Sequence, residues 1–192
     1  MTEPGLRERS KARRRAAIIR AAYELFAERG YDATTVAEIA AAAEVSPRTV
    51  AMYFPSKQDI ALSRFGDGVA GLTEAIRSRD PGESVHEVFG RWLLTSQTDP
   101  AEREVYHLAR RMFAANPDLG ALRSARMADA IREGADMIAA DTGAAPGTIG
   151  PRIAAAAAAA IAMEIIDTEP GAEREQAVAA AMRFLAGGTA AL

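Results

Sequence analysis

Two pairs of residues in this sequence have the spacing of metal ligands in helical proteins. Glu83 with His86, and Glu104 with His107, each form an E-x-x-H pair. Residues three apart lie on one face of a helix, and helical di-iron enzymes hold their metals with such pairs. A metal-dependent enzyme is therefore one alternative. However, Ser84 is a good helix N-cap, which would leave Glu83 outside the helix that carries His86. Both histidines also flank the expected apolar stripes, which favours a position at the helix surface.

Residues for other catalytic chemistry are missing from the sequence. The 192 residues include no cysteine, so a disulfide framework, a thiolate nucleophile and a cysteine metal site are excluded. No G-x-S-x-G motif occurs, and the two histidines give no sign of a hydrolase triad. We therefore expect a protein that is not an enzyme and that has no cofactor.

Cationic residues gather near the N-terminus. Residues 7–20 hold seven arginines or lysines and a single acid, Glu8. The first 57 residues carry a net charge of +3, whereas the remainder carries −6, which together give the overall −3. Such a cluster attracts a polyanion even when the whole protein is acidic. A solvated tail with no partner is the alternative.

Apolar residues recur at helical spacing along the chain, and no convincing stretch alternates with period two. We predict an all-α protein of about nine helices, the first of which ends at Gly30. Capping residues and prolines predict where the helices begin: near Ser10, Thr35, Ser46, Ser56, Ser84, Pro100, Pro117, Pro151 and Ala172.

Two short helices follow one another between residues 35 and 53. Thr35 and Glu38 form a T-x-x-E capping box, and Ser46 with Pro47 begins the second helix. The connection between them is tight, which is the layout of a DNA-binding helix-turn-helix. The alternative is a helix pair that only caps a bundle.

The run TTVAEIAAAAEVSPRTVAMYFPSKQDI resembles the signature of TetR-family transcriptional regulators. The resemblance covers about residues 10–60. It implies a DNA-binding regulator, in the first place a repressor that a small-molecule ligand releases from a palindromic operator. It also implies an N-terminal DNA-binding domain over residues 1–55, ordered from about residue 10, and a C-terminal helical ligand-binding and dimerisation domain over residues 56–192.

The resemblance assigns DNA-contacting roles to residues of this segment. It implies phosphate contacts from Thr35, Thr49, Tyr53 and Lys57. The exposed face of the second helix, with Ser46, Pro47 and Arg48, would read the bases, because a bidentate arginine–guanine contact is the commonest specific one. Basic residues within 11–15 would reach the flanking backbone or minor groove.

Three residues depart from the family pattern. Glu44 stands where the turn usually has glycine, and Ala51 stands where the second helix usually has an aromatic residue. A thymine-methyl contact could replace the missing ring. Met52 is also atypical, and both a core and an interface position are open for it. A helical binding protein that has lost DNA recognition is therefore a further alternative.

The resemblance implies that the last two helices form a homodimer. The alanine run Ala154–Ala160 permits close helix approach, and a stripe on the last helix would complete a four-helix interface between two chains. The alternative is an intramolecular core pair. The stripe consists of Val178, Ala181, Met182 and Leu185.

A small-molecule effector would need an apolar pocket in the C-terminal part. Aromatic and methionine side chains on the apolar stripes are the candidates for lining it: Phe89, Trp92, Tyr106, Met112, Phe113 and Met137. The charged N-terminus is unlike a secretory signal, and the longest apolar run, residues 153–163, is short for a membrane span. We expect a cytoplasmic protein.

Overall fold

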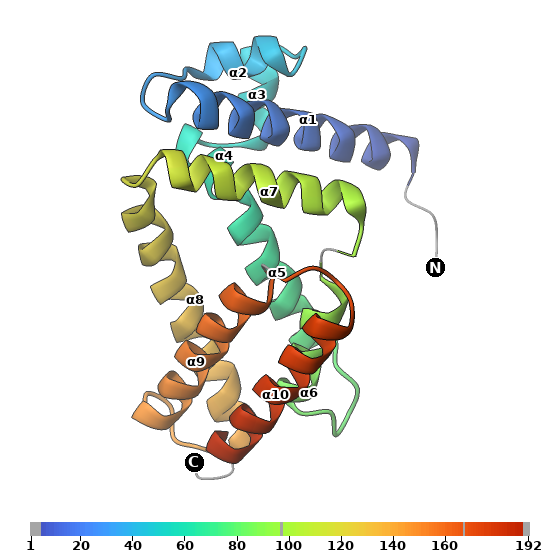
Figure 1. The fold of residues 1–192 in the computed structure, drawn as a ribbon, viewed down its shortest axis with the longest axis vertical. Coiled ribbons are helices and arrows are strands. Elements are labelled where there is room, and N and C mark those ends of the chain that lie inside the picture. The colour runs from blue at the N-terminus through green and yellow to red at the C-terminus, as the bar shows by residue number, and fades with distance from the viewer. Residues whose placement is uncertain (1–4, 97, 167, 190–192) are drawn as a thin grey trace. The chain divides into compact units, whose positions relative to one another are not determined.

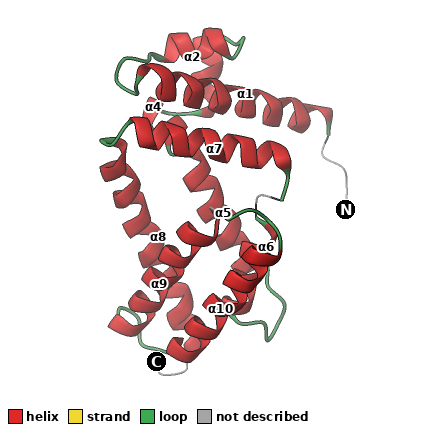
Figure 2. Cartoon of the chain, in the orientation of Figure 1, coloured by secondary structure: helices red, strands yellow, loops and turns green. Residues whose placement is uncertain are grey.

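The computed structural model describes residues 5–96, 98–166 and 168–189. Every regular element in these ranges is an α-helix (Figure 2). This confirms the predicted all-α class, with one helix more than expected. The ten helices are α1 (Leu6–Arg29), α2 (Val36–Ala42), α3 (Pro47–Tyr53), α4 (Lys57–Ala61), α5 (Ser63–Arg77), α6 (Val85–Thr95), α7 (Pro100–Ala115), α8 (Leu119–Thr142), α9 (Ile149–Ile166) and α10 (Ala172–Thr189) (Figure 1).

Contacts within the chain define two compact units. The first unit runs up to Gly66 and adds Ala101–Arg123, so it contains α7 as well as α1 to α4. The second unit comprises Asp67–Pro100 and the chain from Ser124 onward. Helices α5 and α8 each begin in the first unit and end in the second.

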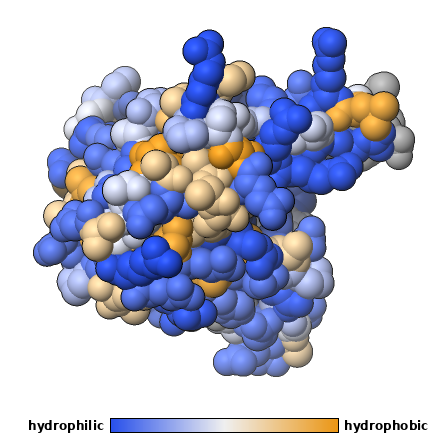
Figure 3. All heavy atoms as spheres, turned by 90° about the horizontal axis from the view of Figure 1, so that it is seen from above, coloured by the Kyte–Doolittle hydropathy of each residue, from blue (hydrophilic) through white to orange (hydrophobic). Residues whose placement is uncertain are grey.

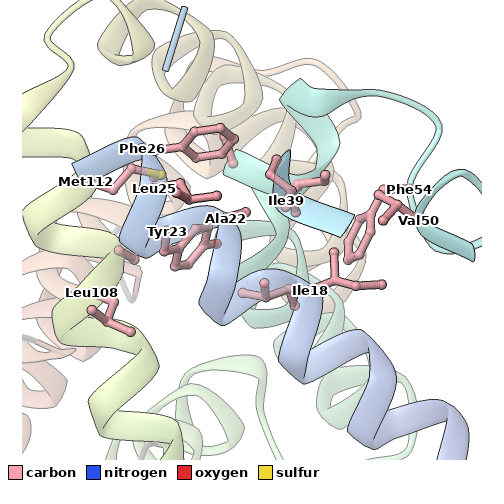
Figure 4. Packing of buried hydrophobic residues seen from close by; sticks show 14 of the residues in the cluster. Ile18, Ala22, Tyr23, Leu25, Phe26, Ile39, Val50, Phe54, Leu108 and Met112 are labelled. Carbon is pink, nitrogen blue, oxygen red and sulfur yellow. The ribbon is translucent and has the colours of Figure 1, made fainter. Parts of the chain in front are cut away.

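The core of the first unit forms where α1 packs against its neighbours (Figure 4). Helix α1 contributes Ile18, Ala22 and Phe26, which are fully buried. Helix α7 lies along α1 and inserts Met112, also fully buried, into the same cluster. The DNA-reading candidates are therefore supported by a single hydrophobic core that includes a helix from much later in the chain.

Local capping signals set the ends of several helices as predicted. The Thr35–Glu38 and Ser84–Glu87 capping boxes are both formed, at the starts of α2 and α6. The Ser56 side chain caps α4 by accepting from the main-chain N–H of Asp59. Helix α1 begins four residues before the expected Ser10, and Gly5 offers it no side-chain cap.

The predicted helix after Ser56 is divided at Leu62, whose φ of −94° and ψ of 4° interrupt the helix. In an unbroken helix the N–H of Arg64 would donate to the carbonyl of Ile60. It donates instead to the Tyr23 hydroxyl, at 3.2 Å. The same hydroxyl lies 3.0 Å from the buried hydroxyl of Ser63. The break thus accompanies a contact with a tyrosine about 40 residues earlier.

The core of the second unit lies where α6 and α9 pack against α10. Close approach of α10 depends on Gly90 in α6, because a Cβ there would come within 2.9 Å of the Met182 sulfur. A second, smaller cluster surrounds Val88, with Ile76 and Val85. The main cluster contains Phe89, Leu93, Ile165, Val178 and Leu185.

A buried arginine ties helix ends together in the second unit. Arg174 is only 2% exposed. Its guanidinium donates to the carbonyls of Ser96, Ile166 and Thr168, at 2.6 to 3.1 Å. Ile166 ends α9 and Ser96 follows α6, so the cation lies at the negative ends of two helices, where positive charge is stabilised.

The predicted dimerisation stripe on the last helix faces inward. Val178 and Leu185 are buried, and Ala181 and Met182 pack against the same cluster. Of the two alternatives for this stripe, the intramolecular one is therefore found. The large exposed apolar side chains of α9 and α10 lie elsewhere: Ile149, Ile153, Met163 and Phe184.

Helix α9 is, within the described residues, the one helix long and apolar enough to cross a membrane by length and composition alone. It also carries Arg152 and Glu164. Its Ala155 and Ile165 are buried, and α6 and α10 pack against it. Only 22% of its residues are buried in the described chain, so these contacts cover part of the helix.

Candidate nucleic-acid interface

The turn between α2 and α3 holds a glutamate in the left-handed region. Glu44 has a φ of 54°, where glycine is the favoured residue. The N–H of Val45 donates to Ala40 O at 2.9 Å, and the N–H of Glu44 donates to Ala41 O at 3.1 Å. This pair of bonds is a Schellman motif, with Glu44 at its left-handed position. The departure noted in the sequence therefore leaves the turn geometry intact, at the cost of backbone strain.

Helix α3 is seated on one side and open on the other. Val50 is 1% exposed and packs into the core of the first unit. Ser46, Pro47 and Arg48 are exposed. Met52 is 79% exposed, so the possibility that it belongs to the core is wrong. The helix thus presents a solvent-facing surface while one buried side chain anchors it.

The two threonine hydroxyls expected to contact phosphate already have partners inside the protein. The Thr35 hydroxyl donates to Glu38 Oε2 at 2.8 Å, and the Thr35 N–H donates to the same oxygen at 2.8 Å. These bonds lower the pKa of Glu38, because they stabilise its carboxylate. The hydroxyls of Ser46 and Thr49 lie 2.8 Å apart. Contact with phosphate would require these hydroxyl protons to turn outward.

Lys57 stabilises the loop between α1 and α2. Its Nζ donates to the carbonyls of Tyr31 at 2.7 Å and Thr34 at 2.9 Å. It also lies 4.2 Å from the centroid of the Tyr31 ring, which is cation–π geometry. An ammonium has three N–H donors, so two carbonyls leave one for a phosphate. Sequence reasoning assigned Lys57 only the phosphate role.

Cations extend beyond the short helices along the start of α1. Lys11, Arg13 and Arg14 are exposed. Figure 3 shows this projecting end of α1 as mostly hydrophilic, with a hydrophobic patch next to the grey atoms at its tip. Arg15 differs, because its guanidinium lies 5.4 Å from the centroid of Phe54 at the end of α3. The first unit therefore carries positive charge next to its exposed short helix.

Helix α7 is joined to α1 by polar contacts as well as by the core. The Arg20 guanidinium donates two parallel bonds to the Glu104 carboxylate, at 2.5 and 2.7 Å. The hydrogen bond from Arg20 lowers the pKa of Glu104. Asn116, just after α7, accepts from the N–H of Tyr31 at 2.6 Å and donates to the carbonyl of Phe26 at 2.8 Å. Both ends of the contact between the two helices are thereby fixed.

The E-x-x-H pairs form no metal site. Glu104 is engaged by Arg20, and Glu83 forms an ion pair with Arg91. Ser84 is the N-cap of α6, so Glu83 lies outside that helix, as its sequence indicated. No group of three or more histidine, aspartate or glutamate residues able to hold a metal occurs in the part of the chain that the structure describes.

The six candidates for a ligand pocket fall into two sets. Tyr106, Met112 and Phe113 lie on α7 in the first unit. Met112 is fully buried in the core, and the Arg123 guanidinium lies over the Phe113 ring in cation–π geometry. Phe89, Trp92 and Met137 belong to the second unit. There, the rings of Phe89 and Trp92 stack at 6.2 Å. A separate open hollow lies between α9 and α10, lined by Ala160, Ile161, Met163, Glu164, Ile165, Ala177 and Ala181.

Two residues of structural weight carry no signal that sequence reasoning used. These residues are Asn116, just after α7, and Arg174, in α10. Their partners are main-chain carbonyls that are distant in sequence, such as Phe26 for Asn116 and Ser96 for Arg174. Side-chain patterns within a helix do not report such partners.

Residues 18–63 match the family described as bacterial regulatory proteins, tetR family. Over 81 residues the chain is 43% identical to the HTH-type transcriptional regulator TcmR of Streptomyces glaucescens. This match covers 42% of this chain and 36% of TcmR. Over 72 residues it is 35% identical to the uncharacterized HTH-type transcriptional regulator YdeS of Bacillus subtilis. That match covers 38% of this chain and 35% of YdeS. The matches thus span about a third of each curated relative.

Solved structures match over nearly the whole chain, at low sequence identity. Salmonella enterica GusR is 20% identical with a TM-score of 0.63, covering 99% of this chain and 98% of GusR. NalD, described as the secondary repressor of the MexAB-OprM multidrug efflux pump in Pseudomonas aeruginosa, is 21% identical with a TM-score of 0.57. That match covers 91% of this chain and 96% of NalD. These likenesses show that the chain shares its all-α fold with both proteins over nine-tenths or more of its length.

Proposed function

This chain belongs to the tetR family of bacterial regulatory proteins, and on that premise we propose that it is a repressor that binds a palindromic operator as a homodimer. A transcription regulator of this family is not an enzyme, so the alternative of a metal-dependent enzyme is rejected. The proposed division of labour keeps residues 1–55 as the DNA reader and residues 56–192 as the effector-binding and dimerising part. Such a regulator works in the cytoplasm.

One observation carries the DNA-binding proposal. The surface of α3 opposite the buried Val50 is open to solvent and includes Arg48, and exposed cations of α1 lie in the same unit. An arginine on an exposed reader helix can bond guanine O6 and N7 in the major groove. Cations on α1 can neutralise phosphates, which sets affinity and register without reading sequence. The proposed interface therefore comprises Thr35, Ser46, Pro47, Arg48, Thr49, Tyr53 and Lys57.

Exposed apolar side chains support the homodimer. Ile153 on α9 and Phe184 on α10 are 61% and 68% exposed, and the apolar hollow between these helices lies beside Met163. A two-fold dimer buries the same surface twice, so one such patch is sufficient. Two readers then contact successive major grooves about 34 Å apart, which gives a selectivity that one short helix lacks.

Release by a small molecule requires an effector that binds the DNA-free geometry better than the DNA-bound geometry. The three candidates of the second unit, Phe89, Trp92 and Met137, supply apolar surface for such a ligand. The indole of Trp92 lies against the small residues Gly68 and Gly71 of α5. An effector at this ring would therefore contact the helix that leads into the first unit.

Mobility shift with the duplex that flanks the gene for this chain tests DNA binding, at about 50 mM and 200 mM salt, a range over which phosphate contacts lose much of their strength. We expect Arg48→Ala to lower the affinity for the duplex that the wild-type chain binds, until it approaches the affinity for random DNA. The control Arg14→Ala should lower the affinity for the bound duplex and for random DNA by the same factor. Equal effects of the two changes on every duplex would contradict base reading by α3, and no binding at low salt would contradict the function itself.

A further inference from the structure

The outermost surface of α3 combines one cation with one long apolar side chain. At 3.6 residues per turn, Arg48 and Met52 lie about 160° and 200° around the helix from Val50. Val50 is the buried anchor, so these two side chains point most directly away from the core. Thr49 and Tyr53, by contrast, are half-buried. Any surface that α3 meets face on is therefore met first by Arg48 and Met52.

The exposure of Met52 has no explanation within the described part of the chain. Its side chain is 79% exposed, although it is one of the larger apolar side chains on the molecule. Exposed Ala51 lies beside it, so the apolar surface continues toward the edge of the helix. Neither residue can donate a hydrogen bond through its side chain as Arg48 can. Their partner must itself offer an apolar group.

The major groove offers one such group. Base edges there present hydrogen-bond donors and acceptors, and the apolar exception is the C5-methyl group of thymine. The positive charge that accompanies α3 in the first unit favours nucleic acid over an apolar protein surface as the partner. The flexible methionine side chain can adjust to reach a methyl group.

The spacing of the two residues limits where that thymine can lie. Four residues advance an α-helix by about 6 Å, whereas successive base pairs are about 3.4 Å apart. We propose that Met52 is a specificity-determining residue that packs on a thymine methyl one or two base pairs from the guanine bound by Arg48. This inference rests on the proposed DNA-binding function. It assigns a direct reading role to a residue that departs from the family pattern.

Replacing thymine by deoxyuridine removes the methyl group and leaves the pairing edge unchanged. Duplexes are first selected from a random pool with the full-length chain, and each thymine of the selected half-site is then replaced singly. We expect one thymine, within two base pairs of a conserved guanine, to lose about two- to fivefold in affinity on replacement, the range for one buried methyl group.

Two variants assign that loss to Met52. Met52→Leu keeps an apolar side chain and should keep the sensitivity to deoxyuridine, whereas Met52→Gln should bind thymine and deoxyuridine duplexes equally. Because the side chain is exposed, both should melt at the wild-type temperature. Undiminished sensitivity in Met52→Gln, or selected half-sites without a thymine near the guanine, overturns the inference while DNA binding stands. Failure of the wild-type chain to retain any duplex overturns the proposed function as well.

Discussion

The side-chain amide of Asn116 donates to the main-chain carbonyl of Phe26, a residue 90 positions earlier, at 2.8 Å, where the ends of α1 and α7 meet. The same nitrogen donates to Met112 O at 2.7 Å, and the amide oxygen accepts from the N–H of Tyr31. One side chain therefore satisfies main-chain groups at the ends of both α1 and α7. The Phe26 carbonyl also accepts from the main-chain N–H of Gly30, at 3.1 Å, so Asn116 adds a second bond there.

Asn116→Ala removes all three bonds, and we expect the free energy of unfolding to fall by about 2–3 kcal/mol, roughly one for each bond. Urea denaturation gives the value. Arg111→Ala, on an exposed residue of α7, is the control and should be nearly neutral. If Asn116→Ala unfolded at the same urea concentration as the wild type, water would have replaced the amide without loss of stability.

Glu44→Gly relieves the left-handed strain in the turn between α2 and α3. A non-glycine residue in this region costs about 1–2 kcal/mol, and glycine returns about 0.5–1 kcal/mol through its freer unfolded chain. We expect a gain of about 0.5–1 kcal/mol in unfolding free energy by urea denaturation. Glu44→Ala keeps the strain and should resemble the wild type. If Glu44→Ala gained as much stability as Glu44→Gly, the gain would come from removing the negative charge and not from relieving the strain.

Lys57→Met keeps an unbranched side chain one atom shorter and removes the two bonds from Nζ to the carbonyls of Tyr31 and Thr34. Charge-assisted bonds at a half-buried site predict a loss of about 1–2 kcal/mol. Hydrogen exchange should rise in residues 31–35, and affinity should fall for every duplex alike. Lys11→Met, on exposed α1, should leave both the stability and the exchange of this loop unchanged.

Glu104 makes part of the stability depend on pH. The hydrogen bond from Arg20 lowers its pKa from the ordinary 4.5, so its contribution is fully present above pH 4.5 and is lost as the pH falls through the lowered value. Glu104→Gln should therefore be less stable than the wild type at neutral pH, and the difference should shrink in acid. Thermal melts across this range measure it. Arg20→Gln should give the same convergence, and a difference independent of pH would exclude the ion pair as its source.

Phe184→Glu tests the proposed dimer surface on α10. Phe184 is 68% exposed in the single chain, and burying it twice in a symmetric interface predicts a dimer dissociation constant raised about 100-fold or more. Sedimentation over a range of concentrations reports this constant. Arg183→Glu changes the charge of the exposed residue beside it and should have a much smaller effect. A Phe184→Glu chain that dimerises like the wild type would place the interface elsewhere.

Signals within four residues of one another predicted much of the fold. The capping boxes at Thr35 and Ser84 and the end of α1 at Gly30 are found where their sequences place them. Such features depend on neighbouring main-chain groups, so a local pattern is sufficient. The exposed surface of α3 was predictable in part: Ser46, Pro47 and Arg48 are exposed as expected, whereas Met52 could not be assigned to core or interface from the sequence.

Contacts between distant residues were beyond local patterns. The break at Leu62 accompanies a bond to the Tyr23 hydroxyl, and the loop contacts of Lys57 involve carbonyls more than 20 residues earlier. The stripe of Val178 and Leu185 is apolar whether it faces α6 or a second chain, so periodicity could not distinguish the two. In each case the partner had to be known before the role could be assigned.

Because Leu108, Met112 and Leu119 complete the core formed by residues 18–61, the folded first unit is not a contiguous stretch of sequence. A fragment stopped after α4 would expose the apolar side of α1 that α7 covers. A chimaera that joins α1 to α4 to a different C-terminal domain must therefore include the α7 segment as well, or replace it with a redesigned helix of the other protein.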